Sequence, residues 1–354
     1  MRNVSYIPYS LDLSHPADRR RIKIWIDNCA HSINLSEDHV KSGDVLILSS
    51  GASLRYWSTH HKGPVVIDLV DGYLSAGTRF IENFARNFLR ASLGKSSFRS
   101  VTFTNELKRA ISKCSAVIVS CPEQKKEIAS INSNVICILD DHTEIKNEIS
   151  EPCNLDGEEF VILWEGLGYT LKHLFQVADQ IKEFMHGKRV KLLVVTSSKF
   201  YRWSRRIGKV DTRKLLKKHF GEVLDNLEFI EWSIENLKMA AKRAHVGVIP
   251  LDLRDELAVS KPENKLLSFW TLCVPTLCSP VPSYVRVLSA VDSEHYLVQE
   301  AKWKESLDNI FEMYRYDSRV FKLHQEKWRK YLEQIHTRKI LIEKWDEVLQ
   351  PLMQ

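Results

Sequence analysis

Short apolar runs recur along this chain, and segments whose apolar residues have helical spacing separate them. The runs are continuous rather than alternating and rich in Val, Ile and Leu, which is typical of parallel strands buried on both faces. The predicted strands are 44–49, 64–70, 116–120, 134–139, 160–164, 190–196, 227–230, 246–250 and 276–278. Strands that alternate with helices in this way predict a doubly wound α/β fold.

A polar segment at 148–159 interrupts this alternation and contains Pro152 and Gly157. Its composition favours an interdomain linker. A chain of 354 residues is long enough for two domains that each bury a core. We therefore predict one domain over 1–152, a second over 153–335, and a final helix within 336–354.

The composition is that of an ordinary globular protein, with 44% apolar and 27% charged residues, and it excludes disordered and collagen-like classes. A net charge of +6 is too small to indicate nucleic-acid binding by itself. No window approaches the ~18 consecutive apolar residues of a membrane span, and Met1–Ser10 lacks the apolar core of a signal peptide. We therefore expect a cytoplasmic protein.

The seven cysteines are scattered and show no metal-ligand spacing, so we expect reduced core residues. No HExxH-like signature is present, and no metal site is predicted. Asp68 lies inside an apolar strand, where its carboxylate needs hydrogen-bond partners or a raised pKa.

Three basic segments each allow two interpretations. In Thr78–Arg99, phenylalanines and arginines interleave at helical spacing, which fits either a core helix or a helix on an anionic bilayer. Ser198–Lys209 is predicted to be a basic, aromatic loop. Its second interpretation is a surface that stacks on nucleic acid, although no nucleic-acid-binding module accompanies it. The three consecutive arginines of Arg19–Arg21 cannot share one helix face, so at least one points to the cleft or to solvent, although the whole run also fits a solvated face.

The segment 244–284 combines a strand, an acidic loop that ends at Glu256, a helical run and a second strand. Lys261, Asn264 and Lys265 lie at the start of the helical run. In parallel sheets, ligands bind where loops leave the carboxyl ends of the strands. Two lysines and an asparagine there are able to bind a diphosphate, although a solvated helix start has the same composition.

Residues 261–277, KPENKLLSFWTLCVPTL, resemble the nucleotide-sugar segment "KxxNKLLEAMALGVPVV" of the GT-B glycosyltransferases. The positions in register are Lys261, Asn264, Lys265, Leu266, Leu267 and Pro275. Two positions depart from the pattern: Ser268 replaces a glutamate that holds the donor ribose in many members, and Cys273 replaces a glycine.

This resemblance implies two Rossmann-like domains that face a cleft, with a C-terminal helix that returns to the N-terminal domain. It implies transfer of a sugar from a nucleotide-diphospho-sugar, held by the second domain, to a glycan or lipid-linked acceptor held by the first. No metal or other cofactor is expected. The implied donor-binding residues are Gly166, Gly168, Lys199, Arg202, Glu256, Lys261, Asn264 and Lys265.

An inverting reaction needs a base for the acceptor hydroxyl, and Asp71 is the first candidate and His15 the second. By the resemblance the pathway is the synthesis of a bacterial surface polysaccharide. The interpretation of Thr78–Arg99 as a helix on a bilayer implies contact with the inner face of a membrane, and no nucleic-acid partner is expected. Two other functions stay open: a GT-B-shaped binding subunit without catalysis, and a nucleotide-sugar epimerase.

Overall fold

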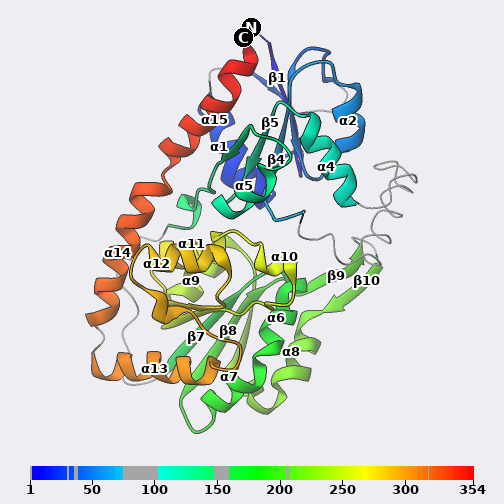
Figure 1. Ribbon diagram of the computed structural model, residues 1–354. Helices are drawn as coiled ribbons and strands as arrows, with labels where there is room; N and C mark the ends of the chain where they lie inside the picture. Colours follow the sequence, from blue (N-terminus) through cyan, green and yellow to red (C-terminus); the bar gives the residue numbers. More distant parts are fainter. Residues whose placement is uncertain are drawn as a thin grey trace. The chain divides into compact units, whose positions relative to one another are not determined.

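The computed structural model describes residues 2–29, 32–35, 39–74, 103–146, 159–204, 207–317 and 319–354. The predicted helix at Thr78–Arg99 and nearly all of the predicted linker lie outside these residues. The chain divides into two compact units, coloured along the sequence in Figure 1. Unit 1 comprises Met1–Asp141, Ser260–Pro262 and Ile335–Gln354, and unit 2 comprises His142–Val259 and Glu263–Gln334.

In its described part, unit 1 contains a six-stranded parallel sheet in the order β2-β1-β3-β4-β5-β6. The strands are β1 (Val4–Ile7), β2 (Ile33–Asn34), β3 (Val45–Ser49), β4 (Val65–Leu69), β5 (Ala116–Val119) and β6 (Val135–Cys137). The helices are a π-helical turn η1 (Asp18–Ile22), α1 (Lys23–Ile26), α2 (Leu54–His60), α4 (Phe103–Lys113), α5 (Pro122–Ile128) and α15 (Arg338–Met353).

Alternate residues of each strand bury opposite faces of this sheet. In β3, Leu46 and Leu48 belong to the core that packs against α2, α4 and α5. Val45 and Ile47 belong to the core that packs against α1 and α15. Both faces are therefore covered by helices, which explains the continuous apolar runs.

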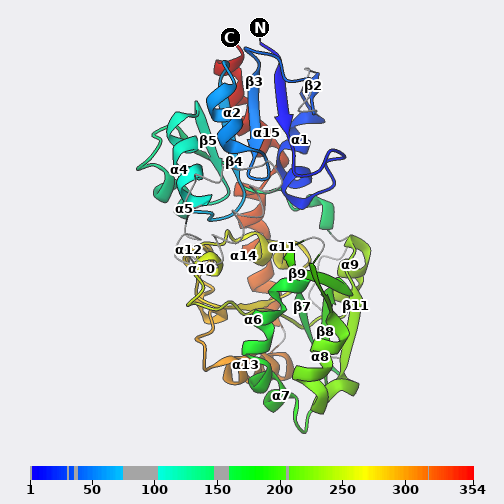
Figure 2. The same ribbon diagram turned by 90° about the vertical axis from the view of Figure 1, so that its right-hand side faces the viewer.

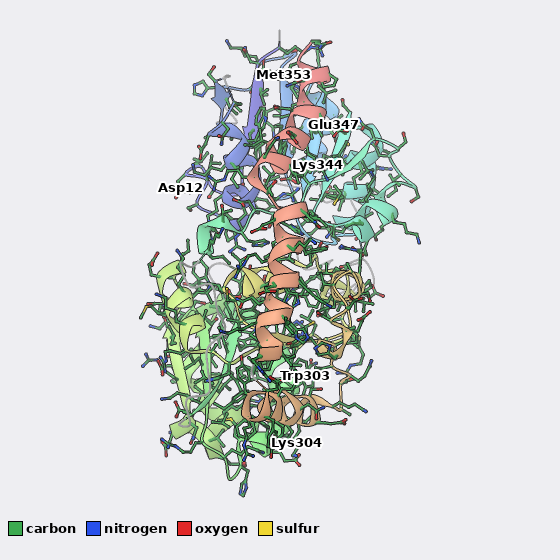
Figure 3. All side chains as sticks on the ribbon, turned by 90° about the vertical axis from the view of Figure 1, so that its left-hand side faces the viewer. Asp12, Trp303, Lys304, Lys344, Glu347 and Met353 are labelled. Atoms are coloured by element: carbon green, nitrogen blue, oxygen red, sulfur yellow. The ribbon has the colours of Figure 1, made fainter. Side chains whose placement is uncertain are left out.

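Helix α15 confirms the predicted return of the C-terminal helix to the N-terminal unit. Thr337 caps its first turn, where the side-chain oxygen accepts from Ile340 N at 3.2 Å. Trp345 is fully buried beside Trp25, with ring centroids 6.3 Å apart. Figure 3 shows this helix lying along the sheet of unit 1, with Met353 near the start of the chain, where Arg2 N donates to Met353 O at 2.8 Å.

Unit 2 contains a five-stranded parallel sheet in its described part, in the order β11-β8-β7-β12-β13. The strands are β7 (Phe160–Glu165), β8 (Val190–Thr196), β11 (Leu227–Glu231), β12 (Val246–Ile249) and β13 (Thr276–Cys278). When the five strands are numbered along the chain, this order is 3-2-1-4-5, as in the Rossmann fold. Leu297 forms a β-bridge with Cys278 of β13, where the Rossmann fold has its sixth strand. The doubly wound α/β class is thus confirmed in both units.

The helical segments of unit 2 are short except near the C-terminal end. They are η4 (Thr143–Ile145), η5 (Gly168–Thr170), α6 (Leu171–Gln176), α7 (Ala178–Met185), α8 (Thr212–Phe220), η6 (Gly221–Asn226), α9 (Ile234–Arg243), α10 (Glu256–Val259), α11 (Asn264–Thr271), α12 (Pro282–Ser289), η7 (Glu294–Tyr296), α13 (Trp303–Tyr316) and α14 (Arg319–Ile335).

The prediction of a loop over Ser198–Lys209 is wrong. The segment forms an antiparallel hairpin of β9 (Lys199–Ser204) and β10 (Ile207–Asp211), which Figure 2 shows facing the viewer. Phe200 pairs with Val210 on one face of the hairpin and packs on the core of unit 2, while Tyr201 pairs with Lys209. The high charge of the segment obscured this alternation of inward and outward residues in the sequence.

Among the described residues, no helix combines the length and apolar character needed to cross a membrane. None of the six cysteines in the described part of the chain forms a disulfide, and Cys114, Cys121 and Cys278 are buried. The expectation of reduced cysteines holds for these six.

Cys273 lies where the resembling pattern has glycine, and the structure gives a reason for glycine there. Helix α11 ends in a Schellman motif, in which Val274 N donates to Phe269 O at 2.9 Å and Cys273 N donates to Trp270 O at 3.0 Å. This motif places Cys273 at φ 63°, in the left-handed region. A residue with a Cβ is strained in that conformation by roughly 1–2 kcal/mol.

We predict that Cys273→Gly is more stable than Cys273→Ala by about 1 kcal/mol, because alanine keeps the strained φ and glycine relieves it. Urea denaturation of both variants measures the difference. The alanine variant is the control, since it removes the thiol without changing the backbone preference. Equal stability of the two variants would contradict a strained helix end.

Candidate functional site

The strand order of unit 2 reverses between β7 and β12, so the loops that follow these strands diverge, and α/β sheets bind their ligands at such a reversal. Gly166 and Gly168 lie in the loop after β7. A Cβ on Gly166 would come within 2.7 Å of Thr170 Oγ1, and a Cβ on Gly168 within 2.4 Å of the Phe200 ring. Close packing therefore requires both glycines, and it holds the backbone of this loop near β7.

Lys265, in the first turn of α11, reaches the same loop. Its Nζ donates to Glu165 O at 2.6 Å and lies 3.6 Å from the Glu165 carboxylate and 5.5 Å from the centroid of the Trp164 ring. The side chain of Lys265 is 28% exposed. The Glu165 carboxylate also accepts from Trp232 Nε1 at 2.9 Å. A partly exposed ammonium group is thus held at the end of β7, beside the glycine loop.

Helix α6 connects this loop to the segment that follows β12. Lys172 Nζ donates to Asp255 at 2.7 Å, and His173 Nδ1 accepts from Asp252 N at 3.2 Å. Asp255 is buried, whereas its neighbour Glu256 is exposed at the start of α10. The buried carboxylate in this region is therefore that of Asp255. Glu256, which the resemblance implies for donor binding, is its exposed neighbour.

The start of α11 is fixed by buried polar contacts. Glu263 precedes the helix, is fully buried, and pairs with Arg286 at 2.9 Å. Ser268 Oγ donates to Asn264 O at 2.8 Å and lies 3.2 Å from His142 Nδ1. Since the single hydroxyl proton of Ser268 is used on Asn264 O, the imidazole is the donor in the second contact. Ser268 is thus bonded within unit 2.

The remaining predicted donor residues are distributed over both units. Lys199 is exposed on β9, opposite Asp211, and Arg202 lies farther along β9, where the structure describes its backbone only. Lys261 belongs to Ser260–Pro262, which the structure groups with unit 1. Within unit 2, the residues brought together are Gly166, Gly168, Asn264 and Lys265.

The strand order of unit 1 reverses between β1 and β3, and polar side chains gather at their carboxyl ends. Tyr9, after β1, shares a hydrogen bond with Ser50 Oγ, after β3, and another of 3.2 Å with Tyr73 OH, after β4. His15 stacks on Tyr9, with ring centroids 4.8 Å apart. These residues come from three loops that lie far apart in the sequence.

Asp71, directly after β4, is half-buried in the same region. Burial raises the pKa of its carboxyl to about 6, the positive charge of Lys261 opposes this rise, and the negative charge of Asp140 adds to it. A carboxyl with this pKa is ionised at neutral pH and is more basic than an ordinary aspartate. Both candidate bases therefore neighbour Tyr9 in unit 1, since His15 stacks on its ring and the charge of Asp71 acts on its hydroxyl.

Beneath this edge, Arg21 forms the centre of a buried ionic network. Its guanidinium donates to Asp68 at 2.6 and 3.3 Å, to Asp140 at 3.1 Å and to Ser120 Oγ at 3.1 Å. Arg21 and Asp68 are fully buried. Burial raises the pKa of Asp68, and the charge of Arg21 opposes that rise. The expected partners of Asp68 are confirmed, and the solvated reading of the arginine run is wrong for Arg21.

Sequence reasoning missed several residues of these sites, namely Tyr9, Arg21, Tyr73, Asp140, Trp164, Glu165, Lys172, Trp232, Asp255 and Glu263. Glu165 and Tyr73 each follow a predicted strand closely, and this position was the signal in the sequence that could have identified them as site residues. The partners of Arg21 gave no such signal, because they lie 47 to 119 residues away in the chain.

No protein-family model matches the sequence, and no curated protein matches it either. Solved structures do match. HepE from Anabaena in complex with UDP and glucose aligns with a TM-score of 0.65 at 12% identity, over 99% of this chain and 100% of that chain. Sucrose-phosphate synthase from Thermosynechococcus elongatus aligns with a TM-score of 0.60 at 13% identity, over 87% and 73%.

A mutant of S. aureus TarM in complex with fondaparinux, α-GlcNAc-glycerol and UDP aligns with a TM-score of 0.57 at 13% identity. The alignment covers 88% of this chain and 57% of TarM, so this chain spans little more than half the length of that relative. The proteins matched here are GT-B glycosyltransferases, and the likeness shows that this chain has the GT-B fold.

We predict that Arg21→Met lowers the free energy of unfolding by about 3–5 kcal/mol, because Asp68 and Asp140 stay buried without their cation. In the variant, the pKa of both carboxyls rises further above the unfolded values, so the folded state binds protons more readily. The difference in the free energy of unfolding between the parent and the variant should therefore become smaller as the pH falls from about 7 to about 5.

Urea denaturation at both pH values measures this effect. Arg19→Met is the matched control, because Arg19 is part of the same run but is only half-buried and donates to Ser14 O at 2.9 Å. A loss for Arg21→Met no larger than that of the control would show that the network contributes little to stability.

Proposed function

We propose that this chain, which has the GT-B fold, transfers a sugar from a nucleotide-diphospho-sugar to a glycan or lipid-linked acceptor. The observation that carries the proposal is the convergence of Lys265 with the Gly166–Gly168 loop at the strand-order reversal of unit 2. We assign donor binding to residues 153–335, acceptor binding to residues 1–152, and the crossover helix to 336–354.

The leaving group of such a reaction is a nucleoside diphosphate, whose developing charge needs stabilisation. Lys265 supplies an ammonium group that is 28% exposed and already positioned by Glu165. Gly166 N donates to Val195 O at 3.2 Å, so the backbone N–H groups that this loop adds are those at the short helical turn Gly168–Thr170. Asn264 lies in the first turn of α11. Cationic and backbone donors of this kind stabilise a diphosphate without requiring a metal ion.

The acceptor hydroxyl must lose a proton if the configuration is inverted, and Asp71 suits this role better than His15. His15 Nδ1 accepts from Ala17 N at 3.2 Å, so the neutral imidazole carries its proton on Nε2. That tautomer donates a hydrogen bond and has no lone pair left on Nε2 to accept a proton. Asp71 has a pKa of about 6 and therefore accepts a proton at neutral pH.

UDP-sugars are the first donors to test, because HepE and TarM were solved with UDP bound. TarM was also solved with a glycan and a glycosylated glycerol, which supports a carbohydrate or lipid-linked acceptor for this chain. We place the reaction in surface polysaccharide synthesis, on the cytoplasmic side of a membrane.

Isothermal titration with UDP-, GDP-, dTDP- and CMP-sugars tests the donor assignment. Binding of one class, followed by sugar transfer to an acceptor, supports a transferase. Binding of none would indicate a GT-B-shaped scaffold, and isomerisation of the sugar without an acceptor would indicate an epimerase.

We predict that Lys265→Ala weakens donor binding by ~1.5–3 kcal/mol, the size of a charge-assisted hydrogen bond to phosphate. Folding should change little, since the side chain lies at a partly exposed helix start. Titration of the best donor and thermal melting measure the two effects. Lys242→Ala, at an exposed position of α9, is the matched control. Unchanged donor affinity in a normally folded Lys265→Ala protein would remove this residue from the site.

We predict that Asp71→Asn lowers turnover by roughly 10² to 10⁴, while donor affinity stays nearly the same. In the parent protein, kcat/KM should fall as the pH drops through about 6, because the Asp71 carboxyl then takes up a proton and no longer acts as a base. The variant should lack this pH dependence. Asp12→Asn, at an exposed position of unit 1, is the control. Turnover within a few-fold of the parent would exclude Asp71 as the base.

A further inference from the structure

The positive charge of this chain is concentrated in one segment of unit 2. Residues 199–218 contain nine Lys or Arg residues and a single acidic residue, Asp211. The whole chain has a net charge of only +6, so the remaining residues together carry slightly more negative than positive charge. The segment corresponds to the hairpin β9–β10 and helix α8.

The outward face of the hairpin carries part of this charge. Tyr201 pairs with Lys209, and Lys199 pairs with Asp211, so these four side chains share one face. Lys199, Tyr201 and Lys209 are exposed. The Phe200–Val210 pair occupies the other face, where Phe200 packs on the core. The hairpin therefore turns two lysines and an aromatic ring to solvent.

Helix α8 carries the rest of the charge that the structure describes. Lys214, Lys217 and Lys218 are exposed, and their i, i+3, i+4 spacing places them on one face. Leu216 and Phe220 are buried on the opposite side. In the described part of the chain, none of these three lysines forms an ion pair. They are available to an external anion.

Hydrogen bonds connect the hairpin to the start of α8. Asp211 ends β10 and caps α8, where its carboxylate accepts from Lys214 N at 3.1 Å. Thr212 N donates to Ser198 O at 3.0 Å, and Thr212 Oγ1 donates to Ser197 O at 2.7 Å. These bonds tie the start of the helix to the base of the hairpin. Figures 1 and 2 show both elements along the same side of unit 2.

We propose that this basic face, defined as Lys199, Tyr201, Lys209, Lys214, Lys217 and Lys218, binds an anionic lipid bilayer. The cations are lysines, which act as hydrated point charges and suit a diffuse negative surface better than a specific bidentate phosphate site. Arg213, the remaining cation of α8, lies over the Phe229 ring at 4.9 Å. An exposed tyrosine such as Tyr201 has an apolar ring and a polar tip, which fit the headgroup region.

This membrane surface differs from the one predicted for Thr78–Arg99, which lies outside the described residues. It uses no residue of the glycine loop or of α11, and it assigns Lys199 to the bilayer rather than to the donor, for which the resemblance implies this residue. Each lysine near an anionic surface contributes roughly fivefold to the binding constant, so binding should be reversible and dependent on salt.

Co-sedimentation with vesicles tests the proposal on the full chain without any substrate. The parent protein should bind phosphatidylcholine vesicles that contain phosphatidylserine at low salt, release them at high salt, and ignore vesicles of phosphatidylcholine alone. The triple variant Lys214→Gln, Lys217→Gln, Lys218→Gln should bind the anionic vesicles at least tenfold and up to about a hundredfold more weakly. Its melting temperature should match the parent, because the three side chains are exposed.

The matched control is Lys113→Gln, Lys125→Gln, Lys126→Gln, which removes the same charge from exposed positions of α4 and α5 in unit 1. It should bind vesicles like the parent. An equal loss in both triple variants would mean that net charge alone acts, and this would overturn the proposal. So would absence of binding to anionic vesicles, or tighter binding of a single-stranded oligonucleotide than of vesicles at the same salt concentration.

Discussion

Both units depend on one constraint: a parallel sheet must bury both of its faces. In β3 and β4 every residue is buried, so the strands have no room for functional side chains on either face. Polar groups are therefore confined to the carboxyl ends of the strands and the loops that follow. The two reversals of strand order, β1–β3 and β7–β12, then decide which loops diverge and where polar residues meet. The candidate sites of both units follow from this packing requirement.

The exception to this rule is the Arg21–Asp68 pair, which places two charges inside the core of unit 1. A buried ion pair is a weak source of net stability, because desolvation offsets most of its attraction. The pair has a clearer effect on the geometry of unit 1 than on its stability. The guanidinium connects Asp68 on β4 with Ser120 after β5 and Asp140 after β6, and so fixes the strand ends beneath Asp71. Asp140 in turn contributes to the raised pKa of Asp71.

Two glycines, and a cysteine where the resembling pattern has glycine, show how backbone packing constrains this sequence. Gly166 and Gly168 are required because Thr170, Trp164 and Phe200 lie too close for a Cβ. The same closeness keeps the loop backbone near Lys265, which is compatible with the role in donor binding that we propose for this loop. Cys273 shows the reverse case, since the Schellman motif imposes a positive φ on a residue that does not favour it.

The sequence by itself determined the elements and the fold class. The apolar runs located β3 to β6 of unit 1 and all five strands of the unit 2 sheet, a final helix was predicted within 336–354, and the 261–277 pattern led to the GT-B fold. Local signals were sufficient there, because strand burial and helix capping depend on residues close together in the chain.

Only the tertiary structure decided the partners of the charged groups. Arg21 reaches Asp140 across 119 residues, and Lys265 reaches Glu165 across 100. Lys261 lies in the short segment Ser260–Pro262, which is grouped with unit 1 although the chain before and after this segment belongs to unit 2. The hairpin β9–β10 also appeared only in the structure, because its inward residues Phe200 and Val210 are too few to outweigh the surrounding charge. Contacts between distant residues depend on how helices and strands pack, and a local pattern of residue types does not encode that geometry.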